Sequence, residues 1–262
     1  MQRTLIFRLL PALTVFTMAA SHLQGQITLI EENFDEANPG AHLTANQGGD
    51  GYAAIRPTYG RYQAFMNDKA EIVPGLSGEG QALQFQDQME DAAMRLVFGA
   101  TDVDPVTTGK IEVSLDFRIE SEAPIERGIP LVIKLSAPTN SNFLTVLISG
   151  EGGHILHTNR STNPAYEGMV LGAPVQPGVT YTLKITADLE TSTYRISVRD
   201  KKEGEQAVLW EASDQEFIPI PDLETNGVGV DLLEIQAGAP DFSQGAAAVT
   251  TTVDHILVRH LE

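Results

Sequence analysis

Acidic side chains recur in the segment KIEVSLDFRIE, residues 110–120, at a spacing that could support bond cleavage. Glu112, Asp116 and Glu120 are even numbers of residues apart, so on an extended strand they share one face. A pair of carboxylates can cleave a glycosidic bond, one as nucleophile or base and the other as acid. Carboxylates on a water-facing strand are far more often solvated surface, and we therefore assign no catalytic residue.

The segment 152–166 combines histidine, arginine and tyrosine. An arginine can neutralise a substrate carboxylate while histidine and tyrosine serve as base and acid in proton abstraction. His154 and His157 are three residues apart, so on a strand they point to opposite faces and cannot form one site unaided. We name His157, Arg160 and Tyr166 as candidate ligand-binding residues. The simpler alternative is that a histidine in this hairpin lies on the surface.

A third group, Arg56, Tyr59, Arg61 and Tyr62, lies in a segment that we expect to be a loop. Aromatic faces stack on sugar rings, and planar polar groups bond to sugar hydroxyls. Large aromatic side chains in exposed loops are uncommon without a partner, so these four residues are candidate ligand-binding residues too. For Trp210, the single tryptophan, we favour a role in packing against the core.

Composition limits the possible partners. The 262 residues include 35 acidic and 17 basic side chains, for a formal net charge of −18. Such a surface repels phosphate backbones, which argues against nucleic acid and against anionic membranes. The chain has no cysteine, which excludes disulfides and a lipid-anchored lipoprotein, and no zinc motif is present.

The N-terminal segment is typical of an export signal. Arg3 and Arg8 precede a short apolar run, and small residues follow it. We expect a signal peptide over residues 1–26, cleaved near 20–26, and one domain over 27–262. The alternative is an anchor that is never cut. The apolar run is short for a membrane span, and no second run follows.

The rest of the chain predicts an all-β fold. Residues 110–120, 181–188 and 193–199 alternate apolar and polar side chains, which is typical of strands with one face in a core. The short turn at LETS makes the last two antiparallel neighbours. PLVIKL (130–135) and NFLTVLIS (142–149) are more continuously apolar, as expected of central strands covered on both sides. Further strands are expected within 152–158, 206–212, 227–235 and 250–260. Together these strands predict a two-sheet antiparallel β-sandwich.

Five stretches, in this order, resemble those of bacterial concanavalin-like jelly rolls, the group that includes laminin-G-like domains. They are EENFDEANPG at 31–40, GQALQF at 80–85, IEVSLDFRI at 111–119, VTYTLKITADLETSTYRISV at 179–198 and TTVDHILV at 251–258. The resemblance covers nearly the whole expected domain. It implies two six- or seven-stranded sheets with the first and last strands adjacent. It also implies a link to carbohydrate, because many members bind glycans and some are polysaccharide lyases or glycoside hydrolases.

The resemblance suggests a cofactor but no catalytic centre. Related folds often hold a structural calcium ion where the chain ends meet, which makes Glu32, Asp35 and Asp254 candidate calcium ligands. The Glu-x-Asp-x-x-Glu strand of the glycosidases and the motif strings of the alginate lyases are absent. Our leading hypothesis is an exported, non-catalytic glycan-binding module. The alternatives are a polysaccharide-degrading enzyme and a structural or adhesion domain with a protein partner.

Overall fold

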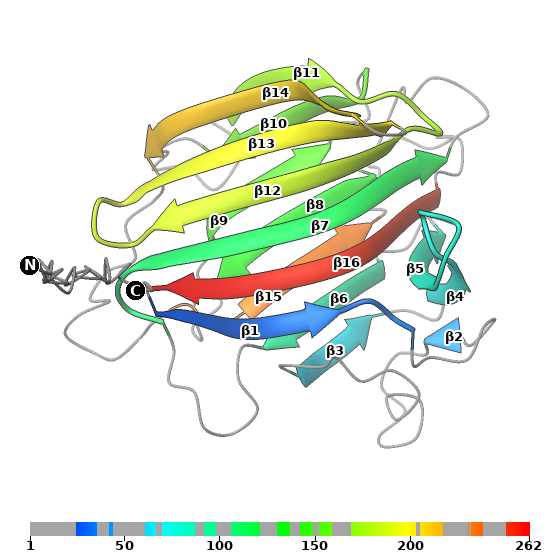
Figure 1. The fold of residues 1–262 in the computed structure, drawn as a ribbon, viewed down its shortest axis with the longest axis horizontal. Helices are drawn as coiled ribbons and strands as arrows, with labels where there is room; N and C mark the ends of the chain where they lie inside the picture. Colours follow the sequence, from blue (N-terminus) through cyan, green and yellow to red (C-terminus); the bar gives the residue numbers. More distant parts are fainter. Residues whose placement is uncertain are drawn as a thin grey trace, which may run out of the picture.

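A computed structural model of the chain describes residues 25–35, 42–43, 61–66, 70–86, 92–97, 106–120, 130–136, 142–148, 152–158, 169–202, 205–216, 230, 232–237 and 250–262. In this part the chain forms two antiparallel β-sheets packed face to face, as Figure 1 shows. The prediction of an all-β sandwich is therefore confirmed. No helix among these residues is long and apolar enough to span a bilayer.

The larger sheet has nine strands. Its order is β14-β13-β12-β7-β16-β5-β4-β2, and β1 pairs with β16 off this path. The bounds are β1 Gln26–Glu32, β2 His42–Leu43, β4 Ala70–Pro74, β5 Gln81–Gln86, β7 Lys110–Glu120, β12 Thr180–Asp188, β13 Thr193–Lys202, β14 Glu205–Glu216 and β16 Thr250–Leu261. The first and last strands are neighbours, as the resemblance implies. The strand count is larger than expected because β5 and β1 pair with successive parts of β16.

The smaller sheet has seven strands in the order β11-β10-β9-β8-β15-β6-β3. The bounds are β3 Arg61–Met66, β6 Ala92–Val97, β8 Leu131–Ser136, β9 Asn142–Ile148, β10 His154–Thr158, β11 Met169–Pro174 and β15 Leu232–Ala237. The expected hairpin of β9 with β10 is present, since Ile155 pairs with Ile148. The strands β3, β4, β6 and β11 were not anticipated by the alternation of residues.

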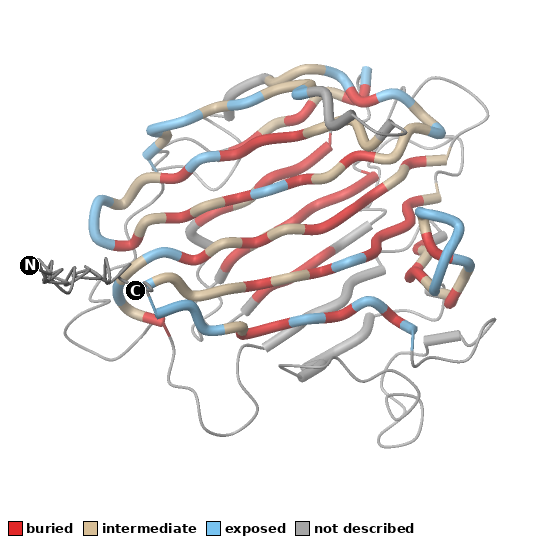
Figure 2. Tube along the Cα trace, viewed as in Figure 1, coloured by how far each residue is buried: buried red, intermediate tan, exposed pale blue. Residues whose placement is uncertain are grey.

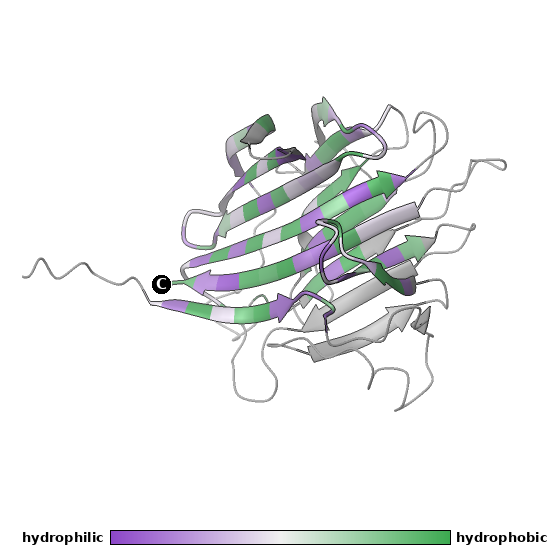
Figure 3. Ribbon diagram, turned by 45° about the vertical axis from the view of Figure 1, so that its right-hand side comes forward, coloured by the Kyte–Doolittle hydropathy of each residue, from purple (hydrophilic) through white to green (hydrophobic). Residues whose placement is uncertain are grey.

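Alternation of apolar and polar residues decides which face of each strand enters the core. In β7 and β12 every second side chain is buried, and Figures 2 and 3 show the burial and hydropathy alternating along these strands. The turn at LETS joins β12 to β13 as antiparallel neighbours, as predicted, and the structure pairs Asp188 with Thr193. A strand with one apolar face stabilises the fold only when that face meets another sheet. Both sheets therefore turn one face inward and one outward.

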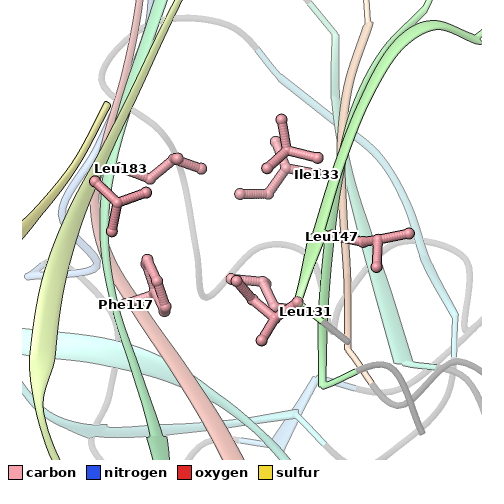
Figure 4. A pocket seen from close by; sticks show the side chains of 8 residues that line it. Phe117, Leu131, Ile133, Leu147 and Leu183 are labelled. Carbon is pink, nitrogen blue, oxygen red and sulfur yellow. The ribbon is translucent and has the colours of Figure 1, made fainter. Parts of the chain in front are cut away.

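The core is the space between the two inner faces. Figure 4 shows Phe117 and Leu183 of the nine-stranded sheet pointing toward Leu131 and Ile133 of the seven-stranded sheet. The gap among these side chains does not admit a water molecule. The ring of Phe117 also stacks on that of Tyr181, with centroids 5.5 Å apart. Dry contact between apolar side chains is thus what holds the sheets together.

The continuously apolar strands β8 and β9 are buried on both faces, as predicted. Leu131 and Ile133 face the core, whereas Val132 and Leu147 belong to the opposite face and are still only 4% exposed. In Figure 4 the side chain of Leu147 points away from the inter-sheet gap. The outer face of the seven-stranded sheet is therefore shielded from water at these positions.

Truncating the core side chain Phe117 should strongly destabilise the fold. We expect Phe117→Ala to lower the free energy of unfolding by about 3–5 kcal/mol, because it removes a fully buried ring and leaves a cavity. The matched control is Val208→Ala on β14, where the side chain is 52% exposed and the expected change is within about 0.5 kcal/mol. Urea unfolding of both variants makes the comparison. Similar losses in the two would contradict this assignment of the core.

Candidate functional site

A charged pair lies on the outer face of the seven-stranded sheet, beside Val132 and Leu147. Lys134 of β8 and Glu234 of β15 are directly opposite in the register, and Lys134 Nζ is 2.9 Å from Glu234 Oε1. The side chain of Glu234 is only 8% exposed and that of Lys134 22%. A carboxylate this shielded is rare at a sheet surface, because taking it out of water costs free energy.

The register extends this pair into a row across four strands. Thr145 of β9 is opposite Lys134, and Arg95 of β6 holds the position opposite Glu234 on the other side. Directly opposite positions in a sheet bring side chains on the same face within reach of each other. The row thus offers a hydroxyl, an ammonium and a carboxylate side by side.

The groups of this row are of the types that form hydrogen bonds with polar ligands. A carboxylate accepts hydrogen bonds from hydroxyl groups, an ammonium donates them and a threonine hydroxyl does both. The adjacent Val132 and Leu147 lie on the same face and are each only 4% exposed. Among the described residues, a second carboxylate does not join Glu234 in the row, so the pairing needed for glycoside cleavage is not formed there.

Neither Lys134 nor Glu234 was among the sequence candidates. A signal was nevertheless present, because each is a single charge inside an otherwise apolar run, VIKL and LLEI. A charge in such a run needs a partner when the strand is covered on both faces. The partner is 100 residues away and becomes visible only when β8 and β15 pair.

The simpler expectation for His157, a surface position, is wrong. Its side chain is 0% exposed and lies on the core face of β10, in register with the core residue Val146 of β9. Its Nδ1 lies 2.7 Å from the hydroxyl of Tyr194 on the opposite sheet, and its ring centroid is 5.0 Å from that of Trp210. Trp210 packs against the core as favoured. His157 links the two sheets and does not reach a ligand at the surface.

Burial also sets the protonation of His157. It lowers the pKa of His157 to about 4, because the imidazolium is poorly solvated between the sheets. Within the described part of the chain, Nε2 has no hydrogen-bond partner. His154 belongs to the other face of β10, as predicted, and its Nδ1 lies 3.0 Å from the carbonyl oxygen of Gly172.

The remaining ligand candidates lie partly outside the described residues. Arg56, Tyr59, Arg160 and Tyr166 are outside them. Arg61 and Tyr62 begin β3, so the expectation that they lie in a loop is wrong. The strand forms because residues 61–66 pair with β6 at the edge of the seven-stranded sheet. These two residues therefore belong to the sheet that carries the row of Lys134 and Glu234.

The three candidate calcium ligands each accept backbone hydrogen bonds. Glu32 Oε1 accepts from Phe34 N at 2.6 Å, Asp35 Oδ1 from Gln81 N at 3.0 Å, and Asp254 Oδ2 from Leu76 N at 3.1 Å. No group of three or more His, Asp or Glu that could hold a metal ion occurs among the described residues. Calcium binding thus stays a prediction from the resemblance.

Asp116 is buried although its face of β7 was expected to meet water. It lies opposite Asp254 on β16, and it accepts hydrogen bonds from Thr182 Oγ1 and Lys201 Nζ, both at 2.5 Å. The pKa of Asp254 is raised, mainly because the carboxyl group is buried and to a lesser extent because of the negative charge of Asp116. His255 and two backbone amides act in the opposite direction but do not cancel this effect. Each carboxylate oxygen of Asp116 and Asp254 accepts a hydrogen bond from the protein. We therefore assign the two carboxylates a structural role in holding β7 and β16 to the neighbouring segments.

The depressed pKa of His157 predicts a loss of stability in acid. The unfolded histidine takes up its proton near pH 6.5 and the folded one only near 4, so stability falls as the pH drops through this window. At pH 5 we expect a loss of about 2 kcal/mol relative to pH 7.5 from this group. Glutamine does not titrate, so in the His157→Gln variant the free energy of unfolding, measured with urea, should fall by about 2 kcal/mol less between pH 7.5 and pH 5. Parallel profiles for the two proteins would contradict the assignment.

Comparison by sequence gives no relative. No protein-family model matches the chain, and no curated protein matches it either. The likeness to known proteins therefore rests on the fold.

Solved structures with the same arrangement of sheets include enzymes and lectins. An endo-1,3-β-glucanase from Streptomyces sioyaensis has a TM-score of 0.52 and 14% identity, over 91% of this chain and 97% of its own. Lectin I from Ulex europaeus, in complex with the methyl glycoside of α-L-fucose, has a TM-score of 0.50 and 11% identity, over 89% and 97%. The exoplasmic/lumenal domain of VIP36, in a form bound to Ca²⁺ and Man₃GlcNAc, has a TM-score of 0.50 and 9% identity, over 89% and 91%. With two antiparallel sheets in this order and near full-length matches, the chain has the jelly-roll fold of the concanavalin A-like lectins and glucanases.

Proposed function

We propose that this chain is an exported, non-catalytic carbohydrate-binding module whose glycan lies on the outer face of the seven-stranded sheet. The observation that carries the proposal is the shielded pair of Lys134 and Glu234 on that face. A buried ion pair often stabilises a fold no better than apolar residues of the same volume. Its place outside the core is therefore better explained by a ligand than by folding.

The chemistry of the face suits a sugar. Hydroxyl groups of a glycan both donate and accept hydrogen bonds, and Thr145, Lys134 and Glu234 supply the complementary groups in one row. Arg56, Tyr59, Arg61 and Tyr62 stay candidate ligand-binding residues that are proposed from the sequence alone.

The structural neighbours support a carbohydrate ligand. The lectin from Ulex europaeus and the VIP36 domain are described with bound saccharides, and the Streptomyces sioyaensis enzyme is a glucanase. Fold alone does not choose between binding and cleavage. The absence of a second carboxylate beside Glu234 in the described row favours binding. Export is proposed from the N-terminal segment alone.

Affinity electrophoresis tests the proposal. We expect the protein to be retarded in native gels cast with at least one neutral polysaccharide, without loss of the polymer when the gel is stained. Thr145→Val and Glu234→Gln should each weaken the retardation about tenfold, because the first removes a hydroxyl and the second replaces one charged acceptor oxygen by an amide nitrogen that cannot accept. The gels are run with and without calcium, which also tests the predicted ion.

The matched control is Glu120→Gln on the nine-stranded sheet. Glu120 pairs with Arg118 at the other end of β7 from Lys110, so this variant removes a carboxylate from an ion pair on the other outer face. It should leave the retardation unchanged. Cleared tracks in the polymer stain would identify an enzyme instead. Free migration through a broad panel would count against a glycan ligand and favour a protein partner.

A further inference from the structure

A polar hollow of about 470 Å³ lies on the nine-stranded sheet, far from the row just described. It crosses four neighbouring strands near the turn that joins β12 to β13. Its volume is within the range of small-molecule sites. The lining residues are Lys110, Thr186, Asp188, Thr193, Tyr194, Arg195, Ser213 and Asp214.

A β-bulge in β14 shapes one wall of the hollow. Tyr194 pairs with Gln215 and Ile196 with Ala212, so the two residues Ser213 and Asp214 lie opposite the single residue Arg195. Asp214 has φ 54°, a left-handed conformation that Asp tolerates better than most residues. The bulge bends the strand and re-aims its side chains, and as a result the otherwise regular sheet gains a recess.

Two ion pairs hold charged side chains in place around the hollow. Asp188 Oδ2 is 3.2 Å from Lys110 Nζ, while its Oδ1 accepts from the amides of Glu190 and Thr191, each at 3.1 Å. Burial alone would raise the pKa of Asp188, but these amides and Lys110 outweigh it and lower that pKa, so the carboxylate stays ionised. Arg195 is paired in the same way with Glu211 on β14. These charges are already satisfied within the protein.

Three groups that line the hollow have no hydrogen-bond partner within the described residues: the hydroxyls of Thr186 and Ser213 and the carboxylate of Asp214. Two cationic and two anionic side chains balance one another around them. A balanced lining gives no net attraction to a phosphate or to a metal cation. Hydroxyls and a carboxylate are, however, good partners for the hydroxyl groups of a neutral polyol.

We propose that this hollow is a second saccharide-binding site, for one neutral sugar unit, on the opposite outer face of the sandwich. The inference rests on the proposed function, which it extends to a second contact with the same class of ligand. The lining includes no exposed aromatic ring, since Tyr194 is 2% exposed and its hydroxyl bonds to His157. Binding without stacking is weak, so we expect a dissociation constant in the millimolar range.

Amide NMR titration of the whole protein tests this proposal. The probes are glucose, galactose, mannose, fucose, xylose and N-acetylglucosamine, with inorganic phosphate as a charged comparison. We expect at least one sugar to shift the amide signals of residues 186, 193, 213 and 214 in a saturable way. Phosphate should leave them in place. Saturable shifts with phosphate alone would overturn the choice of a neutral ligand.

Variants on the two faces separate this inference from the proposed function. Thr186→Val and Asp214→Asn keep the size of the side chain, and each should weaken the sugar-dependent shifts at least about tenfold. Thr180→Val is the control, on the same strand and the same face but about 20 Å away, and it should change nothing. Shifts confined to residues 134, 145 and 234 would overturn the second site and leave the proposed function standing. Shifts at neither face with any sugar would overturn both.

Discussion

The alternation of strand faces is the constraint on which the rest of this structure depends. Each strand commits every second side chain to the dry space between the sheets, where Phe117 and Leu183 meet Leu131 and Ile133. Polar groups are expensive there, so the chemistry of the chain must lie on the two outer faces. Some polar side chains are nevertheless buried there, and His157 is one of them. It lies between the sheets, shares a hydrogen bond with Tyr194 and stays neutral at physiological pH because burial lowers its pKa to about 4.

The last strand, β16, pairs with β1, β5 and β7, and its register with β7 shifts between Asp254 and Leu257. Thr250–Val253 pair with β5 and Ile256–Leu261 with β1, and between them the register shifts and His255 adopts φ 48°. Asp254 lies at this shift, 1% exposed, and holds the turn after β4 through Leu76 N. The carboxylate that the resemblance links to calcium therefore has a structural role in joining the last strand to the turn after β4.

The fold could be predicted from the sequence because the alternation of apolar and polar residues that marks a strand lies within a single segment of the chain. The alternation in β7, β12, β13 and β16 lies within single segments, and the order of those segments points to one architecture. The strands β3, β4, β6 and β11 escaped because RYQAFM, AEIVP, AAMRLV and MVLGAP lack clear alternation or β-branched runs. They are strands because neighbours in the sheet supply their hydrogen bonds, and tertiary context overrides local preference in this way.

The candidate site could not be found in the same manner. Lys134 and Glu234 are 100 residues apart and meet only through the pairing of β8 with β15. The burial of His157 depends on which face of a five-residue strand turns inward, and the sequence HILHT offers apolar residues on both sides of it. The bulge at Ser213 and Asp214 is likewise a matter of register with β13, and a register is a property of two strands.

A crystal structure of the protein with a bound oligosaccharide would show whether the outer face of the seven-stranded sheet recognises a glycan through the row of Thr145, Lys134 and Glu234. We expect saccharide density across β9, β8 and β15, with sugar hydroxyls within hydrogen-bond distance of Lys134 Nζ and the Glu234 carboxylate. Saccharide bound only elsewhere on the molecule, with the row closed off by protein, would contradict this expectation.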